Sequence, residues 1–283
     1  MSDAFTFTLD VEDHRPTPET EQRLPRTTRA VLDWARRRDV RGTVFVVGAI
    51  AEEHPDLITD VVEAGHEVGL HAWEHVPLTT RTRAEFEEET KRGKALLEDL
   101  SGQEIVGFRA PTFSIVRSTQ WATEVLSDLG FTYSSSVLPA WSPLFGFPGL
   151  PRDPFTWASG LVELPAPILK VGPLGLPWIG GAYLRALPGP LVRWAGRHLS
   201  DDAVPFTYCH PYDFDTGEPY WVVPGTGRVL SRVLWIGRHR MFERVGGLLG
   251  DAPAPPLRDR LEGVAPAGAH RIPSAEPTSG DGQ

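Results

Sequence analysis

The sequence predicts an α/β fold on a parallel sheet, and three observations point to it. Short apolar segments alternate with longer helical segments along the first half of the chain, as in strand–helix–strand units with parallel strands. Residues 43–47 are a continuous apolar, β-branched run, the pattern of a strand buried on both faces. Acidic, basic and histidine residues follow several strands, where such folds collect their active residues. We therefore expect a distorted (β/α) barrel.

The expected elements can be justified in chain order. Residues 5–9 alternate as a half-buried strand does, and residues 20–38 have helical spacing that ends in a basic turn. After the buried run at 43–47, strands and helices continue to alternate. The further predicted elements are a helix from Pro55 to about Gly65, a strand at 67–70, a polar helix at 82–100, a strand at 104–108, a helix near 118–128, a strand at 131–133, a late strand at 203–210 and a helix at 225–249.

Residues 139–190 do not follow this alternation of strands and helices. They hold many prolines, glycines and aromatic residues, and are too irregular for strand–helix units and too aromatic for a disordered segment. We interpret them as an insertion that either forms a substrate-facing wall or covers a sheet edge. Residues 1–250, insertion included, are expected to form one barrel domain. From residue 251 Pro, Ala, Gly and Ser dominate, so 251–283 are predicted to be a disordered tail.

The composition narrows the range of partners. The chain has 283 residues, 41% of them hydrophobic, and a net charge of −9, which argues against nucleic acid as the main partner. Its single cysteine, Cys209, excludes an internal disulfide and is expected to be a buried structural thiol. The first residues lead straight into a strand without signal-peptide features, and no apolar run reaches about 18 residues. These features predict a cytoplasmic protein without a membrane span.

The residues with catalytic chemistry lie in three separated places. Residues 9–14 end an apolar strand in an acidic cluster, His71 and His75 lie four residues apart, and His210 ends a late strand. Together they offer a general base, a divalent-metal site with an open position and a general acid. This combination predicts a metal-dependent hydrolase.

Each of these patterns also has a simpler explanation. On a helical turn, His71 and His75 would face the same side and could reach one ion, although such pairs also occur by chance on surfaces. One carboxylate of the acidic cluster should complete the metal site and another should serve as base, but the cluster could also be a solvated turn. The strand before His71 and the nearby carboxylates favour metal ligation.

The ordered set of motifs resembles the polysaccharide deacetylase family, also called NodB-homology proteins or carbohydrate esterase family four. The resemblance covers about residues 5–245, and its later part resembles the branch found with exopolysaccharide loci. The motifs that carry it are the N-terminal acidic cluster, Gly65-His66-Glu67-Val68-Gly69-Leu70-His71 with His75 four residues on, Phe108-Arg109-Ala110-Pro111, and Tyr208-Cys209-His210-Pro211.

The resemblance implies a role for each matching residue. Asp10 matches the family's base, and His71 and His75 match its two metal histidines. Arg109 matches the arginine that pairs with and orients the base. His210 matches the acid that protonates the leaving amine. The implied cofactor is a divalent metal, Zn²⁺ first, with Co²⁺ or Ni²⁺ as alternatives.

Two departures from the family pattern affect these roles. The usual adjacent Asp-Asp is replaced by residues 10–13, Asp-Val-Glu-Asp. Family branches with an Asp-x-Asp version place the metal ligand two residues after the base, so the resemblance implies Glu12, with Asp13 as the alternative. Ser134 stands where related sequences usually have an aspartate. Any role of that carboxylate in the pocket is therefore in doubt.

Further residues close to the motifs are assigned by position. Pro111, Trp73 and Tyr212 are expected to contact substrate. His66 and Glu74 are expected to form structural hydrogen bonds and to take no part in catalysis.

These expectations combine into one predicted reaction. It is metal-dependent hydrolysis of an N-acyl amide, N-acetyl above all, on a sugar or glycoconjugate, releasing acetate and a free amine. The partner is then a small-molecule or oligosaccharide substrate. The alternatives are an amidase or deformylase acting on a small-molecule amide, a catalytically inactive binding module of the same fold, and a metal-independent glycosidase with paired carboxylates.

Overall fold

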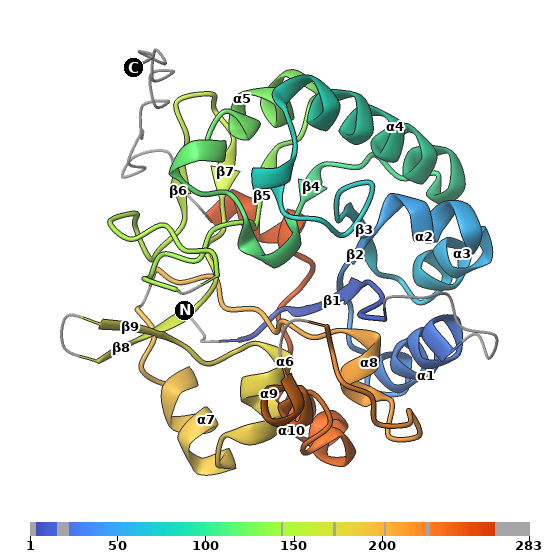
Figure 1. The fold of residues 1–283 in the computed structure, drawn as a ribbon, viewed down its shortest axis with the longest axis vertical. Helices are drawn as coiled ribbons and strands as arrows, with labels where there is room; N and C mark the ends of the chain where they lie inside the picture. Colours follow the sequence, from blue (N-terminus) through green and yellow to red (C-terminus); the bar gives the residue numbers. More distant parts are fainter. Residues whose placement is uncertain are drawn as a thin grey trace.

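The computed structural model describes residues 4–15, 23–142, 144–171, 174–200, 202–224 and 227–263. Their strands form a parallel sheet with helices packed around it (Figure 1). The strands are β1 (Phe7–Val11), β2 (Gly42–Val46), β3 (Glu67–Leu70), β4 (Gly107–Phe108), β5 (Tyr133–Ser134), β6 (Phe155–Thr156), β7 (Val162–Glu163), β8 (Ile168–Val171) and β9 (Leu174–Pro177).

The helices alternate with the strands in the first half and cluster together in the second. The α-helices are α1 (Arg23–Arg36), α2 (Gly48–Glu53), α3 (Pro55–Glu63), α4 (Arg83–Ser101), α5 (Ala122–Asp128), α6 (Gly181–Ala186), α7 (Gly189–Gly196), α8 (Pro211–Phe214), α9 (Gly227–Val233) and α10 (Met241–Leu249). The 3₁₀ helices are η1 (Leu78–Thr80), η2 (Pro111–Phe113), η3 (Arg117–Thr119), η4 (Arg238–Arg240) and η5 (Leu257–Gly263).

The main sheet has the strand order β1-β2-β3-β4-β5-β7-β6, and its pairs are parallel except for β6 with β7. Beyond β1, parallel bridges join Leu9 to Cys209 and Gly180 to Tyr208. The α/β fold with a parallel sheet is confirmed. Within the described residues these pairings do not close the sheet into a ring, so the closed barrel stays a prediction.

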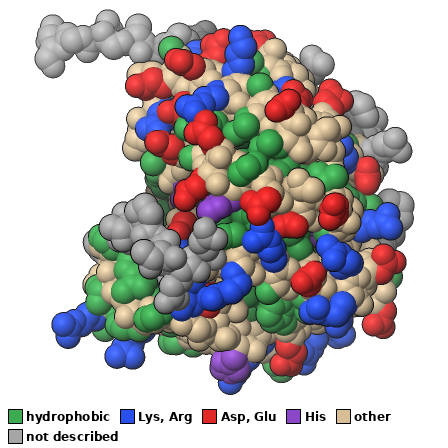
Figure 2. Space-filling model, turned by 90° about the vertical axis from the view of Figure 1, so that its right-hand side faces the viewer, with side chains coloured by type: hydrophobic (Ala, Val, Ile, Leu, Met, Phe, Trp, Pro, Cys, Tyr) green, Lys and Arg blue, Asp and Glu red, His purple; other side chains and the backbone are tan. Residues whose placement is uncertain are grey.

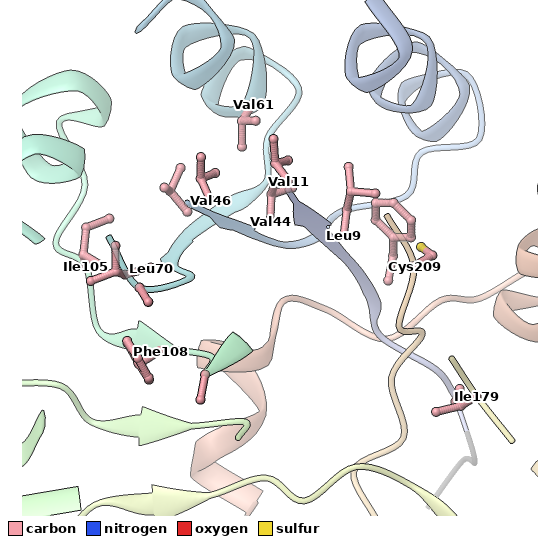
Figure 3. Close-up of a cluster of buried hydrophobic side chains, with 14 of the residues drawn as sticks. Leu9, Val11, Val44, Val46, Val61, Leu70, Ile105, Phe108, Ile179 and Cys209 are labelled. Atoms are coloured by element: carbon pink, nitrogen blue, oxygen red, sulfur yellow. The ribbon is translucent and has the colours of Figure 1, made fainter. Parts of the chain in front are cut away.

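One face of the sheet packs against the surrounding helices. Leu9 and Val11 of β1 and Val44 and Val46 of β2 are buried on this face and meet Val61 of α3 (Figure 3). Burying an aliphatic side chain contributes about 1.5–3 kcal/mol, and this layer repeats along the strands. Because side chains alternate along a strand, the residues between these aliphatic ones point to the opposite face. That opposite face carries the candidate site.

Helix α4 begins where the sequence supplies a capping pair. Thr82 caps α4: its hydroxyl accepts a hydrogen bond from the Glu85 backbone N–H, while the Glu85 carboxylate accepts one from the Thr82 N–H. This reciprocal pair satisfies two of the orphan donors of the first turn. The polar helix predicted at 82–100 is confirmed as Arg83–Ser101.

The inner face of the sheet has its own apolar cluster, which includes Phe45, Phe206 and Leu257. Leu257 of η5 is fully buried, and its backbone N–H donates to the Thr43 hydroxyl. The disordered tail predicted from residue 251 is therefore wrong for residues 251–263, because this buried anchor holds them against the strands. Residues 264–283 lie outside the described residues.

The proline-rich segment 139–190 does more than cover an edge. Its strand β7 pairs in parallel with β5, so the segment extends the main sheet. Trp157 is buried there, and its indole N–H donates to the Glu163 carboxylate. The same segment also contains the antiparallel hairpin β8–β9, which projects from the body of the molecule in Figure 1. The segment is thus an insertion that contributes strands to the sheet, in addition to any role as a wall or a cover.

The single helix predicted at 225–249 is also wrong, because the chain is interrupted between α9 and α10. Gly237 has a φ of 72°, in the left-handed region that favours glycine. A Cβ atom at this position would lie 2.5 Å from the Arg185 carbonyl oxygen. The close approach of these two backbones therefore requires a glycine and ends the helical run.

Other expectations about single residues are confirmed. Cys209 is fully buried, and burial raises the pKa of its thiol well above the ordinary value. His66 accepts a hydrogen bond from the Gly42 N–H at 3.0 Å, and Glu74 pairs with Arg81. Both His66 and Glu74 therefore have structural partners.

The surface agrees with the charge composition. On the face shown in Figure 2, acidic and basic side chains are interspersed, without an extended basic area. Of the helices in the described part of the chain, none is both long and apolar enough to cross a membrane.

Candidate active site

The centre of the site is the carboxylate of Glu12, just after β1, and the imidazoles of His71 and His75, just after β3. Glu12 Oε2 lies 3.0 Å from His71 Nε2 and 2.5 Å from His75 Nε2. The ligand atoms of the three residues all lie within 4.8 Å of one another, the one such group found among the described residues. The sequence motifs therefore meet at one point in space.

A loop, not a helical turn, brings the two histidines together. The backbone from His71 to Val76 has no helical hydrogen-bond pattern, and Ala72 has a φ of 60°. The carbonyl of Ala72 accepts the N–H of Gly48 at the start of α2, which anchors the loop. The structure brings the two predicted histidines together, but the helical-turn argument for their spacing is wrong.

The surroundings of His71 orient it as a ligand. Its Nδ1–H donates to the Arg109 carbonyl at 2.8 Å, which leaves Nε2 directed at Glu12. Such a second hydrogen bond fixes the tautomer and ring direction of metal-binding histidines.

The donor set fits a divalent cation. Two imidazole nitrogens and a carboxylate oxygen suit Zn²⁺, Co²⁺ or Ni²⁺. His75 Nε2 and Asp10 Oδ2 are buried without an aligned hydrogen-bond partner, as expected for atoms that a bound cation or its water would satisfy. Glu12, His71 and His75 can therefore hold the metal.

Asp10 lies beside this group with one oxygen bonded and the other free. Its Oδ1 accepts from Arg109 Nη1 at 2.6 Å, and its Oδ2 is 3.7 Å from His71 Nε2. Arg109 is itself fully buried and also donates to Thr8 and Ser135. The bond between Asp10 in β1 and Arg109 after β4 spans the inner face of the sheet, which must therefore be strongly curled.

His210 faces the same group from the other side. Its Nε2 is 3.6 Å from Glu12 Oε1, and its Nδ1–H donates to Asp213 Oδ2 at 2.9 Å. Asp213 Oδ2 also accepts the His210 backbone N–H at the start of α8. These two bonds to Asp213 hold the ring with Nε2 toward Glu12.

The charges set the protonation states of the site. Burial alone would lower the pKa of His210, but the carboxylates of Glu12 and Asp213 raise it to about 9. Burial likewise opposes the charge on Glu12, yet the imidazoles of His75 and His210 hold its pKa well below the ordinary value. Near neutral pH His210 carries a proton and Glu12 does not.

Tyr212 joins the two sides of the site. Its hydroxyl donates to Glu12 Oε1 at 3.0 Å, and its ring stacks on His210 with centroids 4.7 Å apart. The other face of the Tyr212 ring stacks on His14, which bonds to Glu218. Tyr212 therefore lies beside the clustered ligand atoms and bonds to Glu12, whereas its predicted contact with substrate stays a prediction.

Other candidate residues are not brought into this group. The carboxylate of Asp13 forms a bidentate pair with Arg15 and is not among the clustered ligand atoms. Trp73 is buried beneath the guanidinium of Arg92, 3.6 Å from the ring centroid. Pro111 is also buried, at the start of η2, where it shapes the turn after Arg109.

Ser134 stands where related sequences usually have an aspartate, but a carboxylate lies beside it on the adjacent strand. Glu163 of β7 is in register with Ser134 and is fully buried. Its Oε1 accepts the backbone N–H groups of Ser136 and Val137, so it fixes the turn that follows β5. Burial raises the pKa of this carboxyl group. Glu163 thus holds the turn that begins next to Ser135, whose hydroxyl accepts a hydrogen bond from Arg109.

Sequence reasoning missed Glu163 and Asp213. The signal for Asp213 was its position three residues after His210, as in a helix capping pair. Glu163 had no comparable local signal, because its partners come from a different strand.

Comparison with known proteins identifies two regions. Residues 7–134 match the family model described as polysaccharide deacetylase. Residues 135–258 match a model described as a domain of unknown function, DUF3473.

Curated relatives match about a third of the chain. A peptidoglycan-N-acetylglucosamine deacetylase from Listeria monocytogenes is 32% identical over 84 residues, 30% of this chain and 18% of the relative. A chitooligosaccharide deacetylase from Azorhizobium caulinodans is 30% identical over 104 residues, 36% of this chain and 47% of the relative. The matches thus span less than half of either relative.

A solved structure matches nearly the whole chain. A Mycobacterium smegmatis protein described as a polysaccharide deacetylase superposes with a TM-score of 0.68 and 22% identity, over 97% of this chain and 94% of that one. This likeness shows that the fold is shared across both regions. The chain therefore contains a polysaccharide deacetylase region, residues 7–134, followed by a DUF3473 region, residues 135–258.

Proposed function

We propose that this protein is a metal-dependent hydrolase that removes the acetyl group from an N-acetylated sugar or glycoconjugate. One observation carries the proposal: the Asp10 carboxylate and the His210 imidazole flank the Glu12–His71–His75 group. A base, a metal site and an acid are the groups that amide hydrolysis requires, because water must be activated and the amine is a poor leaving group.

The residues divide the proton transfers between them. Asp10 Oδ2 is free and takes a proton from the attacking water, while Arg109 holds the other oxygen of the carboxylate. His210 Nε2 gives its proton to the amine nitrogen as the C–N bond breaks. One water is consumed, and acetate and a free amine are released. Asp10 then releases its proton to solvent, and His210 takes up a proton from solvent.

A divalent cation held by Glu12, His71 and His75 would supply the remaining chemistry, by lowering the pKa of a water and polarising the acyl carbonyl. Tyr212 and the Arg109 carbonyl contribute by fixing Glu12 and His71 in place. We propose Zn²⁺ as this ion, with Co²⁺ or Ni²⁺ as alternatives.

The substrate class is argued from the relatives. Two of them are named for deacetylating peptidoglycan N-acetylglucosamine and chitooligosaccharides. An N-acetylated amino sugar, free, lipid-linked or in a short oligosaccharide, is the corresponding substrate that we propose here.

The test is acetate release from a panel of N-acetylated mono- and oligosaccharides by protein stripped with EDTA and reloaded with Zn²⁺, Co²⁺ or Ni²⁺. We expect no release without metal and restored release with at least one ion. A formamide panel run in parallel identifies a deformylase. Stoichiometric metal binding with no hydrolysis of any amide would instead favour a binding module, and hydrolysis unaffected by EDTA would refute the metal-dependent mechanism.

A further inference from the structure

Arg185 lies in the region that matches the domain of unknown function. It is buried next to Asp213, the partner of His210. It belongs to α6, and its side chain is 2% exposed. A buried guanidinium requires partners for its charge and its donors. Its Nη2 lies 2.9 Å from Asp213 Oδ1, and its Nε donates to the Gly181 carbonyl at 3.0 Å. The remaining donor group, Nη1, reaches the backbone carbonyls of Val233 and Leu234.

Two glycines make room for this arrangement. A Cβ atom on Gly181 would lie 1.9 Å from Asp213 Oδ2, so only glycine lets the carboxylate lie against the start of α6. A Cβ atom on Gly237 would lie 2.5 Å from the Arg185 carbonyl oxygen. Gly181 thus borders Asp213, and Gly237 borders the backbone of Arg185.

Asp213 connects Arg185 to the predicted acid. Its Oδ1 faces Arg185, while its Oδ2 accepts the Nδ1–H and the backbone N–H of His210. Arg185 does not touch the site itself. It can act there only by fixing the carboxylate that orients the imidazole.

We propose that Arg185 is a positioning residue which, through Asp213, holds His210 in the tautomer and direction needed to protonate the leaving amine. The Gly181–Arg185 segment lies, like His210 and Asp213, in the region of unknown function, and the proposal gives this segment a specific part in the reaction. This inference rests on the proposed hydrolase function. The competing explanation is that Arg185 only ties α6 to the carbonyls at 233–234.

Leaving-group chemistry separates these two explanations. In an acetamide the C–N bond breaks only as the nitrogen takes a proton, so loss of the acid is costly. In an aryl acetate such as 4-nitrophenyl acetate the C–O bond breaks to release a stable phenolate, and water still supplies the hydroxyl of the acetate. A defect in the acid therefore lowers amide turnover much more than aryl ester turnover, whereas loose packing lowers both.

The experiment compares kcat of Arg185→Met with wild type on an N-acetylated amino sugar and on the aryl acetate. We expect a loss of about 10–100-fold on the amide, the range for removing a supporting partner, and a loss within about threefold on the ester. Arg185→Lys should recover part of the amide activity. Equal losses on both substrates would overturn the proposal.

A double-mutant cycle tests whether Arg185 acts through Asp213. Asp213→Asn alone should reproduce the amide-selective loss, and adding Arg185→Met should lower the amide rate little further. Arg244→Met is the matched control, because Arg244 also donates to a backbone carbonyl, that of Leu187, and has no carboxylate partner among the described residues. It should leave the amide-to-ester ratio unchanged. Additive losses in the cycle would contradict the proposal.

A spectroscopic readout keeps the inference testable apart from activity. In metal-free wild-type protein, ¹⁵N NMR should find His210 Nδ1 protonated and in a strong hydrogen bond. Arg185→Met or, if that variant fails to fold, Gly181→Ala should weaken this signal because Asp213 is displaced. An unchanged His210 signal in the folded variant would refute the inference. Wild-type protein with this signal but no amide turnover would refute the proposed function instead.

Discussion

The two sides of the site use an arginine in different ways. On the base side, made by Asp10 and Arg109, the guanidinium bonds directly to the proposed catalytic carboxylate. On the acid side, made by His210, Asp213 and Arg185, the guanidinium reaches the imidazole only through a second carboxylate. Both arginines are almost completely buried.

The difference follows from the backbone around each side. Asp10 lies within β1 and Arg109 directly follows β4, so strand pairing already fixes their backbones. His210 follows an isolated bridge and starts the four-residue helix α8. Where the backbone has few ladder hydrogen bonds, side-chain ion pairs must set the geometry. The acid side therefore depends on its polar network more than the base side does.

The largest effect on metal affinity is expected at Glu12, where the two sides meet. Glu12→Gln removes the charge that both imidazoles face, and should weaken metal affinity by more than about 100-fold, because supporting partners alone contribute about 10–100-fold. Asp13→Asn is the matched control and should bind metal as the wild type does. Isothermal titration with Zn²⁺ measures both variants. If Asp13→Asn weakened Zn²⁺ binding more than Glu12→Gln did, Asp13 would be the third metal ligand.

A smaller effect on metal affinity is expected at Tyr212, which stacks on His210 and bonds to Glu12. Tyr212→Phe keeps the stacking on His210 and His14 but removes the hydroxyl that donates to Glu12 Oε1. Metal affinity should fall about tenfold, while folding stability changes little. Competition with a chelating dye measures the affinity. An unchanged affinity would mean that the two sides are not coupled through this bond.

Much of the fold was predictable from the sequence because local patterns determine it. The apolar run at 43–47 became β2, and Thr82 with Glu85 started α4 as a capping pair does. Failures came where a distant contact overrode the local pattern. Gly237 breaks a helical run because Arg185 approaches it, and Leu257 orders a segment of disorder-like composition by inserting into the core.

The site was predictable to a similar extent. Ordered motifs indicated Asp10, His71 and His210. Asp10 lies in β1 and His71 directly follows β3, whereas the strand predicted at 203–210 is reduced to isolated bridges before His210. Asp213 and Arg185 were not identified, because their ion pair joins residues far apart in an irregular part of the chain. No periodicity or spacing marks such a pair.

The division of labour between the two sides can be measured with Asp10→Asn and His210→Ala, each loaded with metal and assayed on an N-acetylated amino sugar and on an aryl acetate. Asp10→Asn should lower both rates by roughly 10²–10⁴-fold, because both reactions need an activated water. His210→Ala should lower the amide rate to a similar degree and the ester rate within about threefold, with metal content unchanged. Equal ester losses in the two variants, or full amide activity in either, would contradict the assignment of base and acid.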